Sequence, residues 1–580
     1  MNSRTQQPFS ILNSRFLLIA LNCICLLAIT TATAFAAERP NVVFILTDDQ
    51  GWFDVGAHGN TTIETPVMDR LAKDGVEFTR FYASPVCAPT RAALMTGRHH
   101  QRTGVVDTFK GLDVLDAREV TIADVFRKAG YRTGCFGKWH LGRYARYHPN
   151  SRGFDEYLGF WQYGFMNRYE DSDELWHNRE RILATGYITD VLTDAAIDFV
   201  KANHKSPFFL YVPYNAPHSP YVAPDRYIEK YLQKGLPLRE ARIYGMITCL
   251  DENIGRLLKT LDDTGVAQNT IVIFMTDNGG VSGHYKAGLR GRKGTVYEGG
   301  VRVPFFVRWP GKFPAGKKID AMVQHIDVFP TLCELIGADP PVDRVIDGKS
   351  LLPLIRSETT ASPHQYLFHQ WNRGKPNPDE SWAAFDGRFK LANGELFDLA
   401  EDPGEQRNIA ARRPDKAREL REAFLAWFAD VTAGRDYTHV PIEVGREDEN
   451  PVELDVTWAD PVGQKVKPDY HGYIRDLVDN WTQEGDAIRW KIEVVRPGTY
   501  EVQLVYGCAP ADAGSVFSIS SGAARLEGKT RPTAGSRVFQ SEVVGRLDLA
   551  AGPANLEIKA EKITGRELMV LHKVWLRRLP

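Results

Sequence analysis

Short apolar runs that alternate with helix-like segments dominate the first half of this 580-residue chain and restrict its fold more than any other feature. The first run, Asn41–Thr47 (NVVFILT), is apolar at most positions, as in a parallel strand that helices cover on both faces. Further strands are predicted at Thr133–Phe136, Phe208–Pro213, Thr270–Thr276 and Val303–Trp309. Helices are predicted between them at Pro66–Lys73, Ile122–Lys128, Asp190–Lys201 and Ile243–Leu261. This alternation predicts an α/β domain over residues 37–360, with a mainly parallel central sheet flanked by helices.

The C-terminal part of the chain shows two other patterns. Short strands and one helix predict a small α+β subdomain over residues 361–433. Polar, proline-containing residues 434–455 predict a linker. Beyond the linker, residues 488–494 alternate between apolar and polar side chains, and we expect residues 456–580 to form a β-sandwich. The elements predicted in the subdomain are strands at Gln365–Trp371, Trp382–Phe385, Phe389–Leu391 and Glu395–Leu399 and a helix at Pro414–Phe428.

The N-terminus has the three parts of a secretory signal peptide, which we predict over residues 1–36. Arg4 and Arg15 precede the apolar run Phe16–Ile29, and a small-residue stretch with the cleavage pattern Ala34-Phe35-Ala36 follows. A transmembrane anchor is the alternative, but the run is shorter than the roughly 20 residues that span a bilayer. We therefore expect a secreted or periplasmic protein with no membrane span.

Composition excludes several classes of protein. With 43% hydrophobic and 25% charged residues the chain is of globular type. Its 71 basic and 73 acidic residues give a formal net charge of -2, so no bulk positive field exists to bind nucleic acid. Five of the seven cysteines follow the signal segment and are widely scattered, which predicts ordinary buried thiols, or one bridge, rather than a disulfide framework. These five are Cys87, Cys135, Cys249, Cys333 and Cys508.

Polar side chains follow four of the predicted strands at the point where each strand ends. Ligands of open α/β sheets bind at the carboxyl ends of the strands. The sequence therefore predicts one site made of acids, amides, a lysine and two histidines. Its candidate residues, in chain order, are Asp48, Asp49, Lys138, His140, Asn215, His218, Asp277 and Asn278.

One cysteine, Cys87, opens a predicted helix with the sequence Cys-Ala-Pro-Thr-Arg91, followed closely by Thr96-Gly97-Arg98. A side chain at this position meets the positive end of the helix dipole, a natural place for an anion. The segment resembles the signature of the type I, formylglycine-dependent sulfatases of the alkaline phosphatase superfamily. Other motifs in the family's order extend the resemblance over residues 39–430. They are Asp48-Asp49-Gln50, Gly137-Lys138-Trp139-His140, Pro217-His218, Thr276-Asp277-Asn278-Gly279, Lys293-Gly294 and Glu298-Gly299-Gly300.

The resemblance implies a covalent mechanism on residue 87. A formylglycine-generating or sulfatase-maturing enzyme oxidises Cys87 to formylglycine, whose aldehyde hydrates to a geminal diol. One hydroxyl attacks sulfur and releases the substrate alcohol, and the second lets the hemiacetal collapse and expel sulfate, so that water never attacks sulfur. The family's metal ligands fall on Asp48, Asp49, Asp277, Asn278 and the modified Cys87. Oxygen ligands suit Ca²⁺, and Mg²⁺ is the alternative.

The remaining catalytic roles follow from the same resemblance. Arg91 is expected to hold the diol and share its charge, while Lys138 and Lys293 clamp the sulfate oxygens. His218 is expected to act as the general acid for the leaving alcohol, and His140 to assist the diol or the elimination. The sequence leaves these two histidine roles interchangeable.

The motifs bind the sulfate group and do not identify the alcohol that carries it. A secreted sulfatase with a β-sandwich resembles bacterial enzymes that desulfate polysaccharides, so we expect a sulfated carbohydrate. Aryl or alkyl sulfates, phosphate or phosphonate esters, and an inactive carbohydrate-binding protein are the alternatives. Two further sets of residues have open roles. Residues that could form either a sugar-binding platform or part of the sandwich core are Trp458, Tyr470, Trp481 and Trp490. Residues that could either line the substrate pocket or serve surface and packing roles are His99, His100, Trp161, Tyr163, His284, Tyr285, Arg290 and Arg292.

Overall fold

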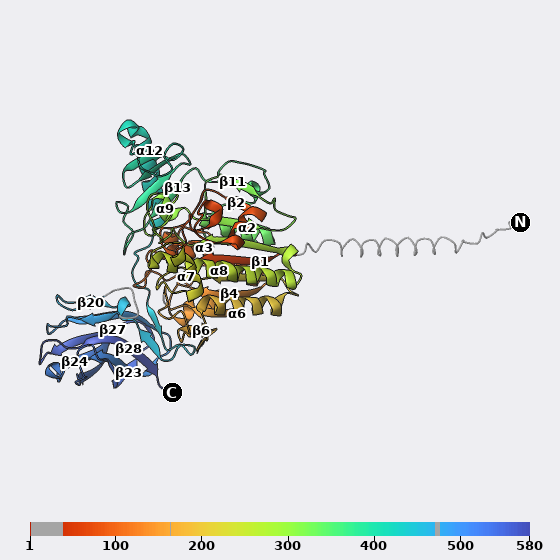
Figure 1. Cartoon of the computed structure of the whole chain (residues 1–580). Helices are drawn as coiled ribbons and strands as arrows, with labels where there is room; N and C mark the ends of the chain where they lie inside the picture. The colour runs from red at the N-terminus through yellow and green to blue at the C-terminus, as the bar shows by residue number, and fades with distance from the viewer. Residues whose placement is uncertain (2–38, 163, 470–475) are drawn as a thin grey trace.

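The computed structural model describes the chain except for residues 2–38, 163 and 470–475. The predicted signal peptide, Tyr163 and Tyr470 therefore lie outside the described residues. An α/β domain, a small α+β subdomain and a C-terminal β-sandwich follow one another along the chain (Figure 1). In the described part, no helix combines the length and apolar character needed to cross a membrane.

The α/β domain is built on a ten-stranded sheet in the order β11-β2-β10-β9-β1-β8-β4-β5-β6-β7. Its centre, from β9 to β5, is parallel, and antiparallel pairs flank it on both sides. This confirms the predicted mainly parallel sheet. The strands are β1 (Asn41–Thr47), β2 (Val76–Phe78), β4 (Arg132–Lys138), β5 (Glu156–Phe160), β6 (Leu175–His177), β7 (Glu180–Ile182), β8 (Phe208–Pro213), β9 (Thr270–Thr276), β10 (Phe305–Arg308) and β11 (Lys317–Ile319).

Both faces of the sheet are covered by helices, because successive side chains of the apolar strands point to opposite faces. Val43 and Ile45 of β1 belong to the core that includes α6 and α8, whereas Val42 and Phe44 belong to the core that includes α3 and α5. The α-helices of this domain are α2 (Pro66–Asp74), α3 (Cys87–Thr96), α4 (His100–Thr103), α5 (Ile122–Lys128), α6 (Ile188–Asn203), α7 (Asp225–Gln233), α8 (Leu238–Asp263), α9 (Glu298–Val301), α10 (Val328–Ile336) and α11 (Leu352–Ile355).

The small subdomain packs a four-stranded antiparallel sheet against α12 (Pro414–Thr432). A buried ion triad joins it to the α/β domain. Lys390 Nζ lies 2.9 Å from Glu298 Oε1 of α9 and 3.0 Å from Glu405 Oε1. The Glu298-Gly299-Gly300 motif thus contributes to the contact between the two units. The strands of the subdomain are β13 (Leu367–Gln370), β14 (Trp382–Phe385), β15 (Phe389–Ala392) and β16 (Glu395–Asp398).

The C-terminal sandwich has two sheets around one core, and it begins earlier than predicted. Two strands within residues 434–455, the predicted linker, belong to it: β17 pairs with β22 and β18 with β28. One sheet holds β17, β19, β22, β24, β25 and β27, and the other β18, β20, β21, β23, β26 and β28. Their bounds are β17 (Ile442–Val444), β18 (Val452–Leu454), β19 (Asp460–Val462), β20 (Lys467–Asp469), β21 (Leu477–Asp479), β22 (Ala487–Val494), β23 (Gly498–Gly507), β24 (Val516–Ser521), β25 (Ala524–Lys529), β26 (Gln540–Leu549), β27 (Gly552–Lys562) and β28 (Val570–Arg578).

The sandwich core continues into the α/β domain. Tyr144 and Tyr147 lie in the same hydrophobic cluster as the sandwich interior, and the Tyr144 ring meets Trp458 edge-on at 4.8 Å. Trp458, Trp481 and Trp490 are exposed by only 3%, 0% and 0%. Of the two roles that the sequence left open for these tryptophans, the structure therefore supports the core and excludes an exposed sugar platform.

Candidate active site

The carboxyl ends of the central strands bring the predicted site residues together. Asp48 and Asp49 follow β1, Lys138 ends β4, and Asp277 and Asn278 follow β9. Asp48 is joined to the loop after β8, since its N donates to Ala216 O (3.1 Å), and Asp277 is joined to the end of β1, since its N donates to Thr47 O (3.0 Å). All five residues are almost fully buried, so their charges interact through a medium of low polarity.

Basic side chains neutralise the carboxylates of this cluster. Lys138 Nζ lies 2.6 Å from Asp48 Oδ2, and Lys293 Nζ lies 2.5 Å from Asp49 Oδ1. Asn278 Nδ2 donates to the same Asp49 oxygen at 2.9 Å. Lys293 comes from the loop before α9, so that strands and loops distant in sequence supply one charge network.

Helix α3 adds the cysteine and the arginine. Cys87 is the first residue of α3 and is 3% exposed. Its Sγ and carboxylate oxygens of Asp48 and Asp277 all lie within 4.8 Å of one another. One turn later, Arg91 donates from Nε (3.1 Å) and Nη2 (2.9 Å) to Asp277 Oδ2 and from Nη1 to Lys138 O (3.1 Å). Arg91 therefore fixes Asp277 beside Cys87.

The two histidines approach the cluster differently. His218 Nε2 is 3.8 Å from Asp49 Oδ2, and its side chain is 18% exposed. His140 is 2% exposed at the side chain, and its Nε2 is 2.9 Å from Thr108 O and 3.8 Å from Asp113 Oδ2. Asp49 and His140 both have positive φ values, 69° and 60°, a conformation that non-glycine residues adopt at an energetic cost and that is concentrated at functional sites.

Burial and charge set the protonation of these groups. Burial, followed by the positive charge of Lys293, lowers the pKa of His218 to about 4. Burial and Lys138 lower the pKa of His140 to about 3. Burial and the neighbouring negative charge of Asp48 raise the pKa of Asp277. Burial also opposes ionisation of Asp48, but attraction to Lys138, His218 and Arg91 outweighs it and lowers the pKa of that carboxyl.

The donor set of this cluster fits a divalent cation. Carboxylate oxygens of Asp48 and Asp49 also converge with a nitrogen of His218 within 4.8 Å. Within the described part of the chain, Asp48 Oδ1 and Asn278 Oδ1 are buried without a hydrogen-bond partner, and such acceptors are costly unless a donor or a cation satisfies them. Oxygen ligands of this kind suit hard cations.

Comparisons with known proteins show the family to which the chain belongs. Residues 40–338 match the family model described as Sulfatase, and residues 291–425 match the model for the C-terminal region of N-sulphoglucosamine sulphohydrolase. The chain belongs to the sulfatase family. Mouse N-acetylgalactosamine-6-sulfatase is 34% identical over 457 residues, covering 67% of this chain and 85% of the mouse protein. Mouse steryl-sulfatase is 30% identical over 528 residues, covering 69% and 83%.

A solved structure extends the similarity to three dimensions. Ps i-CgsB, crystallised with k-i-k-neocarrahexaose, aligns with a TM-score of 0.63 at 30% identity and covers 70% of this chain and 95% of its own. Sulfatases hydrolyse sulfate esters, and the family generally uses a formylglycine and a metal ion. This sulfatase is therefore a sulfuric ester hydrolase, and its α/β core is the family's fold.

The Thr96-Gly97-Arg98 part of the signature has a structural explanation in this sulfatase. Gly97 ends α3 with a φ of 67°, and its N–H bonds to Ala93 O, the left-handed helix end that glycine favours. A Cβ at Gly97 would lie 2.9 Å from Phe329 Cβ. Arg98 Nη1 donates to both oxygens of Glu119 at 3.0 Å. These residues hold the end of the helix whose first residue is Cys87.

The structure also shows the surroundings of several residues whose roles the sequence leaves open. His99 packs edge-on against Trp427, and His100 Nδ1 bonds to Val105 O at 2.8 Å, so both have packing partners. The five predicted thiols are all free and buried, which makes the alternative of one bridge wrong. Thr108 and Asp113, which hold His140, were missed because no motif marks them.

Proposed function

We propose that this sulfatase removes sulfate esters from a sulfated carbohydrate, with a formylglycine made from Cys87 as its nucleophile. The observation that carries the proposal is the position of Cys87, at the start of α3 and within 4.8 Å of the Asp48 and Asp277 carboxylates. A cysteine there is surrounded by the groups that stabilise an oxygen nucleophile and a sulfate ester.

Relatives support the substrate class. The mouse protein at 34% identity is an N-acetylgalactosamine-6-sulfatase, and the structure at 30% identity is a complex with k-i-k-neocarrahexaose. Both names point to sulfated sugars. Steryl-sulfatase is also 30% identical, and its name points to a small sulfate ester. A preference of this sulfatase for small sulfate esters would therefore contradict the proposed substrate class.

A modified residue 87 and a divalent cation would complete this chemistry. Formylglycine supplies a hydrated aldehyde that accepts the sulfuryl group and releases it without attack of water on sulfur. A divalent cation, Ca²⁺ or Mg²⁺, held by Asp48, Asp49, Asp277, Asn278 and residue 87, supplies a Lewis acid for the sulfate oxygens.

The chain's own residues bind and orient the ester. Lys138 and Lys293 offer ammonium groups that balance the charge of the sulfate oxygens as the S–O bond breaks. Arg91 keeps Asp277 in place and shares the charge at residue 87. His218, the more exposed histidine at 18%, is the better placed to protonate the leaving alcohol. The negative charge of a bound sulfate would oppose the lowering of the His218 pKa and favour the protonated imidazole. His140, at 2%, assists at the nucleophile.

Export and maturation complete the proposal. The charged, apolar and small-residue parts of residues 1–36 support a secreted or periplasmic location. The Cys-x-Pro-x-Arg segment from Cys87 to Arg91 supports a maturing enzyme as the transient partner, because a cysteine does not become an aldehyde without an oxidising catalyst.

Divalent cations are expected to stabilise the folded protein. At one hundred times its dissociation constant, a cation that binds only the native state adds about 2.7 kcal/mol to the free energy of unfolding. We expect Ca²⁺ to raise the midpoint of thermal unfolding of EDTA-treated enzyme and Mg²⁺ to raise it less. Asp277→Asn should remove most of this increase. Equal stabilisation of wild type and D277N would contradict the assignment of these ligands.

Gly164 is expected to be essential for the placement of His140. A Cβ at Gly164 would lie 2.4 Å from His140 Cε1, so Gly164→Ala must displace the imidazole. A displacement of about 1 Å lowers turnover by about 10²-fold, measurable as kcat for an aryl sulfate. Gly283→Ala is the matched control, since the nearest described atom to its Cβ would be 3.8 Å away. Equal activity of the two variants would argue against a role for His140.

The proposed function is tested by sulfate release from matured enzyme. The substrates are an aryl sulfate, the matching aryl phosphate, N-acetylgalactosamine 6-sulfate, and sulfated hexasaccharides of carrageenan and chondroitin. We expect kcat/KM to be highest on a sulfated sugar and lowest on the phosphate. Turnover of the aryl sulfate with none of the sugars would overturn the substrate class.

A further inference from the structure

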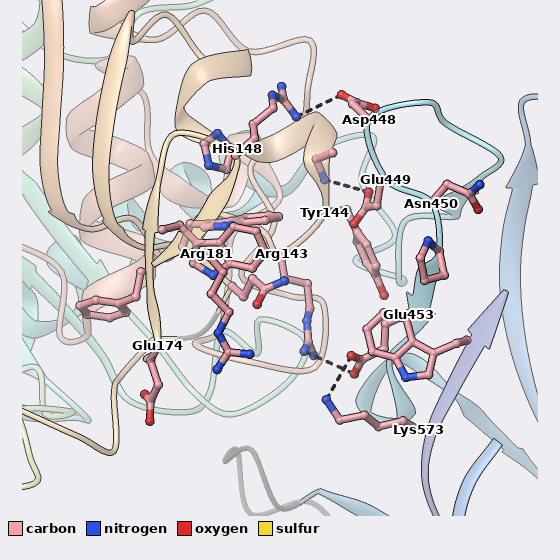
Figure 2. A pocket seen from close by; sticks show the side chains of 18 of the residues that line it. Arg143, Tyr144, His148, Glu174, Arg181, Asp448, Glu449, Asn450, Glu453 and Lys573 are labelled. Atoms are coloured by element: carbon pink, nitrogen blue, oxygen red, sulfur yellow. Dashed lines mark hydrogen bonds and ion pairs between the residues drawn. The ribbon is translucent and has the colours of Figure 1, made fainter. Parts of the chain in front are cut away.

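A cleft of about 480 Å³ lies between the α/β domain and the sandwich (Figure 2). Its lining includes none of the candidate metal ligands of the active site. Its size is within the range of roughly 300–1,000 Å³ typical of small-molecule sites. One wall comes from the segments after β4 and β5 and from β6, the other from residues 448–453 and β28. The two units contribute to it jointly, and they are held by an Ala145 N to Glu449 Oε2 bond of 2.9 Å and an Arg179–Asp448 ion pair of 3.1 Å.

One buried donor lines this cleft with no protein acceptor. Among the described residues, Trp161 Nε1 has no hydrogen-bond partner, and Trp161 is only 5% exposed. Beside it, the His148 ring meets the Trp161 ring edge-on at 4.9 Å and has the Asn178 backbone as a hydrogen-bond partner. A buried N–H group without an acceptor calls for a ligand oxygen.

The rest of the lining suits a carbohydrate. Trp176 and Trp575 are partly exposed on the two walls, and aromatic faces stack on the apolar faces of sugar rings. Charged side chains of both signs, four basic and four acidic, surround them. Guanidinium groups donate hydrogen bonds and carboxylates accept them, so this lining can bind sugar hydroxyls both as acceptors and as donors. A balanced charge does not favour nucleic acid, and charged side chains on both walls do not favour a wholly apolar ligand.

The cleft adjoins the active site. Phe160 is the register partner of Lys138 on neighbouring parallel strands, and Trp139 N donates to Phe160 O at 3.1 Å. Trp161, directly after Phe160, lines the cleft. On the other side, Gly164 packs against the His140 imidazole, and Phe165, its neighbour, also lines the cleft. The same strand ends thus present Lys138 to the sulfate and Trp161 to the cleft.

We propose that this cleft is a glycan-binding subsite that holds sugar units of the substrate next to the sulfated unit in the active site. The proposal rests on the proposed function, since it needs an oligosaccharide substrate. It assigns to the sandwich a role as one wall of the substrate site. In this proposal Trp575 stacks on a sugar ring, which Trp458 and Trp481 cannot do because both are buried.

The test compares long and short substrates in the full, matured chain. Trp575→Ala and Arg181→Ala remove an aromatic face and a donor from the two walls. We expect each to raise KM for sulfated carrageenan or chondroitin hexasaccharides about tenfold, with unchanged kcat/KM for the aryl sulfate and for N-acetylgalactosamine 6-sulfate. Trp575→Phe should retain most of the affinity. The matched control is Arg525→Ala, because Arg525 is 52% exposed on the sandwich outside the cleft and Arg181 is 59% exposed.

The outcomes separate this proposal from the function on which it rests. If wild type desulfates a hexasaccharide and the cleft variants do so with the same KM, the subsite is wrong and the function stands. If wild type cleaves only the aryl sulfate, and its Cys87→Ala form binds none of the hexasaccharides in calorimetric titrations, both fail. A loss of aryl sulfate turnover in Trp575→Ala that Trp575→Phe restores would overturn the subsite as well, because it would place Trp575 in support of the catalytic centre.

Discussion

Replacing Cys87 with alanine is expected to lower sulfate release by about 10⁴-fold or more, because the variant has no nucleophile. Alanine fits the space of the thiol at the start of α3, so the fold and the affinity for sulfated sugars should persist. The comparison uses kcat for an aryl sulfate and calorimetric binding of a sulfated hexasaccharide. Cys333→Ala, which removes another buried thiol, is the control and should retain full turnover.

Serine at this position gives a sharper readout than alanine. A serine hydroxyl can accept the sulfuryl group once, but it has no second hydroxyl with which to expel sulfate. We therefore expect Cys87→Ser to release one equivalent of alcohol at most and then to stall as a sulfate ester. Sustained turnover by C87S or C87A would contradict the covalent mechanism.

The second large effect concerns stability. Lys390→Met is expected to lower the free energy of unfolding by about 3–5 kcal/mol, because it leaves two buried carboxylates without their cation. The side chains of Lys390, Glu298 and Glu405 are exposed by only 1%, 2% and 0%. Burial opposes the charged lysine, but Glu298 and Glu405 outweigh it and raise the pKa of Lys390. Urea unfolding followed by tryptophan fluorescence measures the loss.

The control for this variant is an exposed lysine with the same number of acidic partners. Lys416 pairs with Asp386 at 3.2 Å and Glu419 at 2.8 Å but is 28% exposed, and such surface pairs contribute about 0–1 kcal/mol. Lys416→Met should therefore shift the urea midpoint little. Similar shifts for K390M and K416M would show that the buried triad is not a major contact between the α/β domain and the subdomain.

The sheet was predictable because its central strands carry their signal locally. The bounds of β1, β8 and β9 agree with prediction, since each is a continuous apolar run bounded by polar residues. The run Val76–Tyr82, by contrast, has the residue pattern of a single strand in the sequence but does not form one. Thr79 N donates to Ile319 O, and the chain divides into β2 and β3 (Phe81–Tyr82), which belong to different sheets. A partner strand distant in sequence decides that division, and a single run of residues does not reveal it.

The site was predictable for a similar reason, and the cleft was not. Parallel strands place their carboxyl ends together, so residues such as Asp48, Lys138 and Asp277 could be assigned to one cluster from their positions alone. Trp161 and Trp575 face one cleft only because the sandwich docks beside β5 and β6. Alternation within a strand shows which residues share a face, but not whether that face packs in a hydrophobic core or lines a cleft.

The most direct test of the central claim is a mass spectrum of the peptide that contains residue 87. The protein is produced with a formylglycine-generating enzyme, and its activity is measured on the same sample. The account predicts an aldehyde in place of the Cys87 thiol, reactive towards a hydrazide probe, in a fraction that rises with the specific activity. A fully active sample in which residue 87 is an unmodified thiol would contradict it.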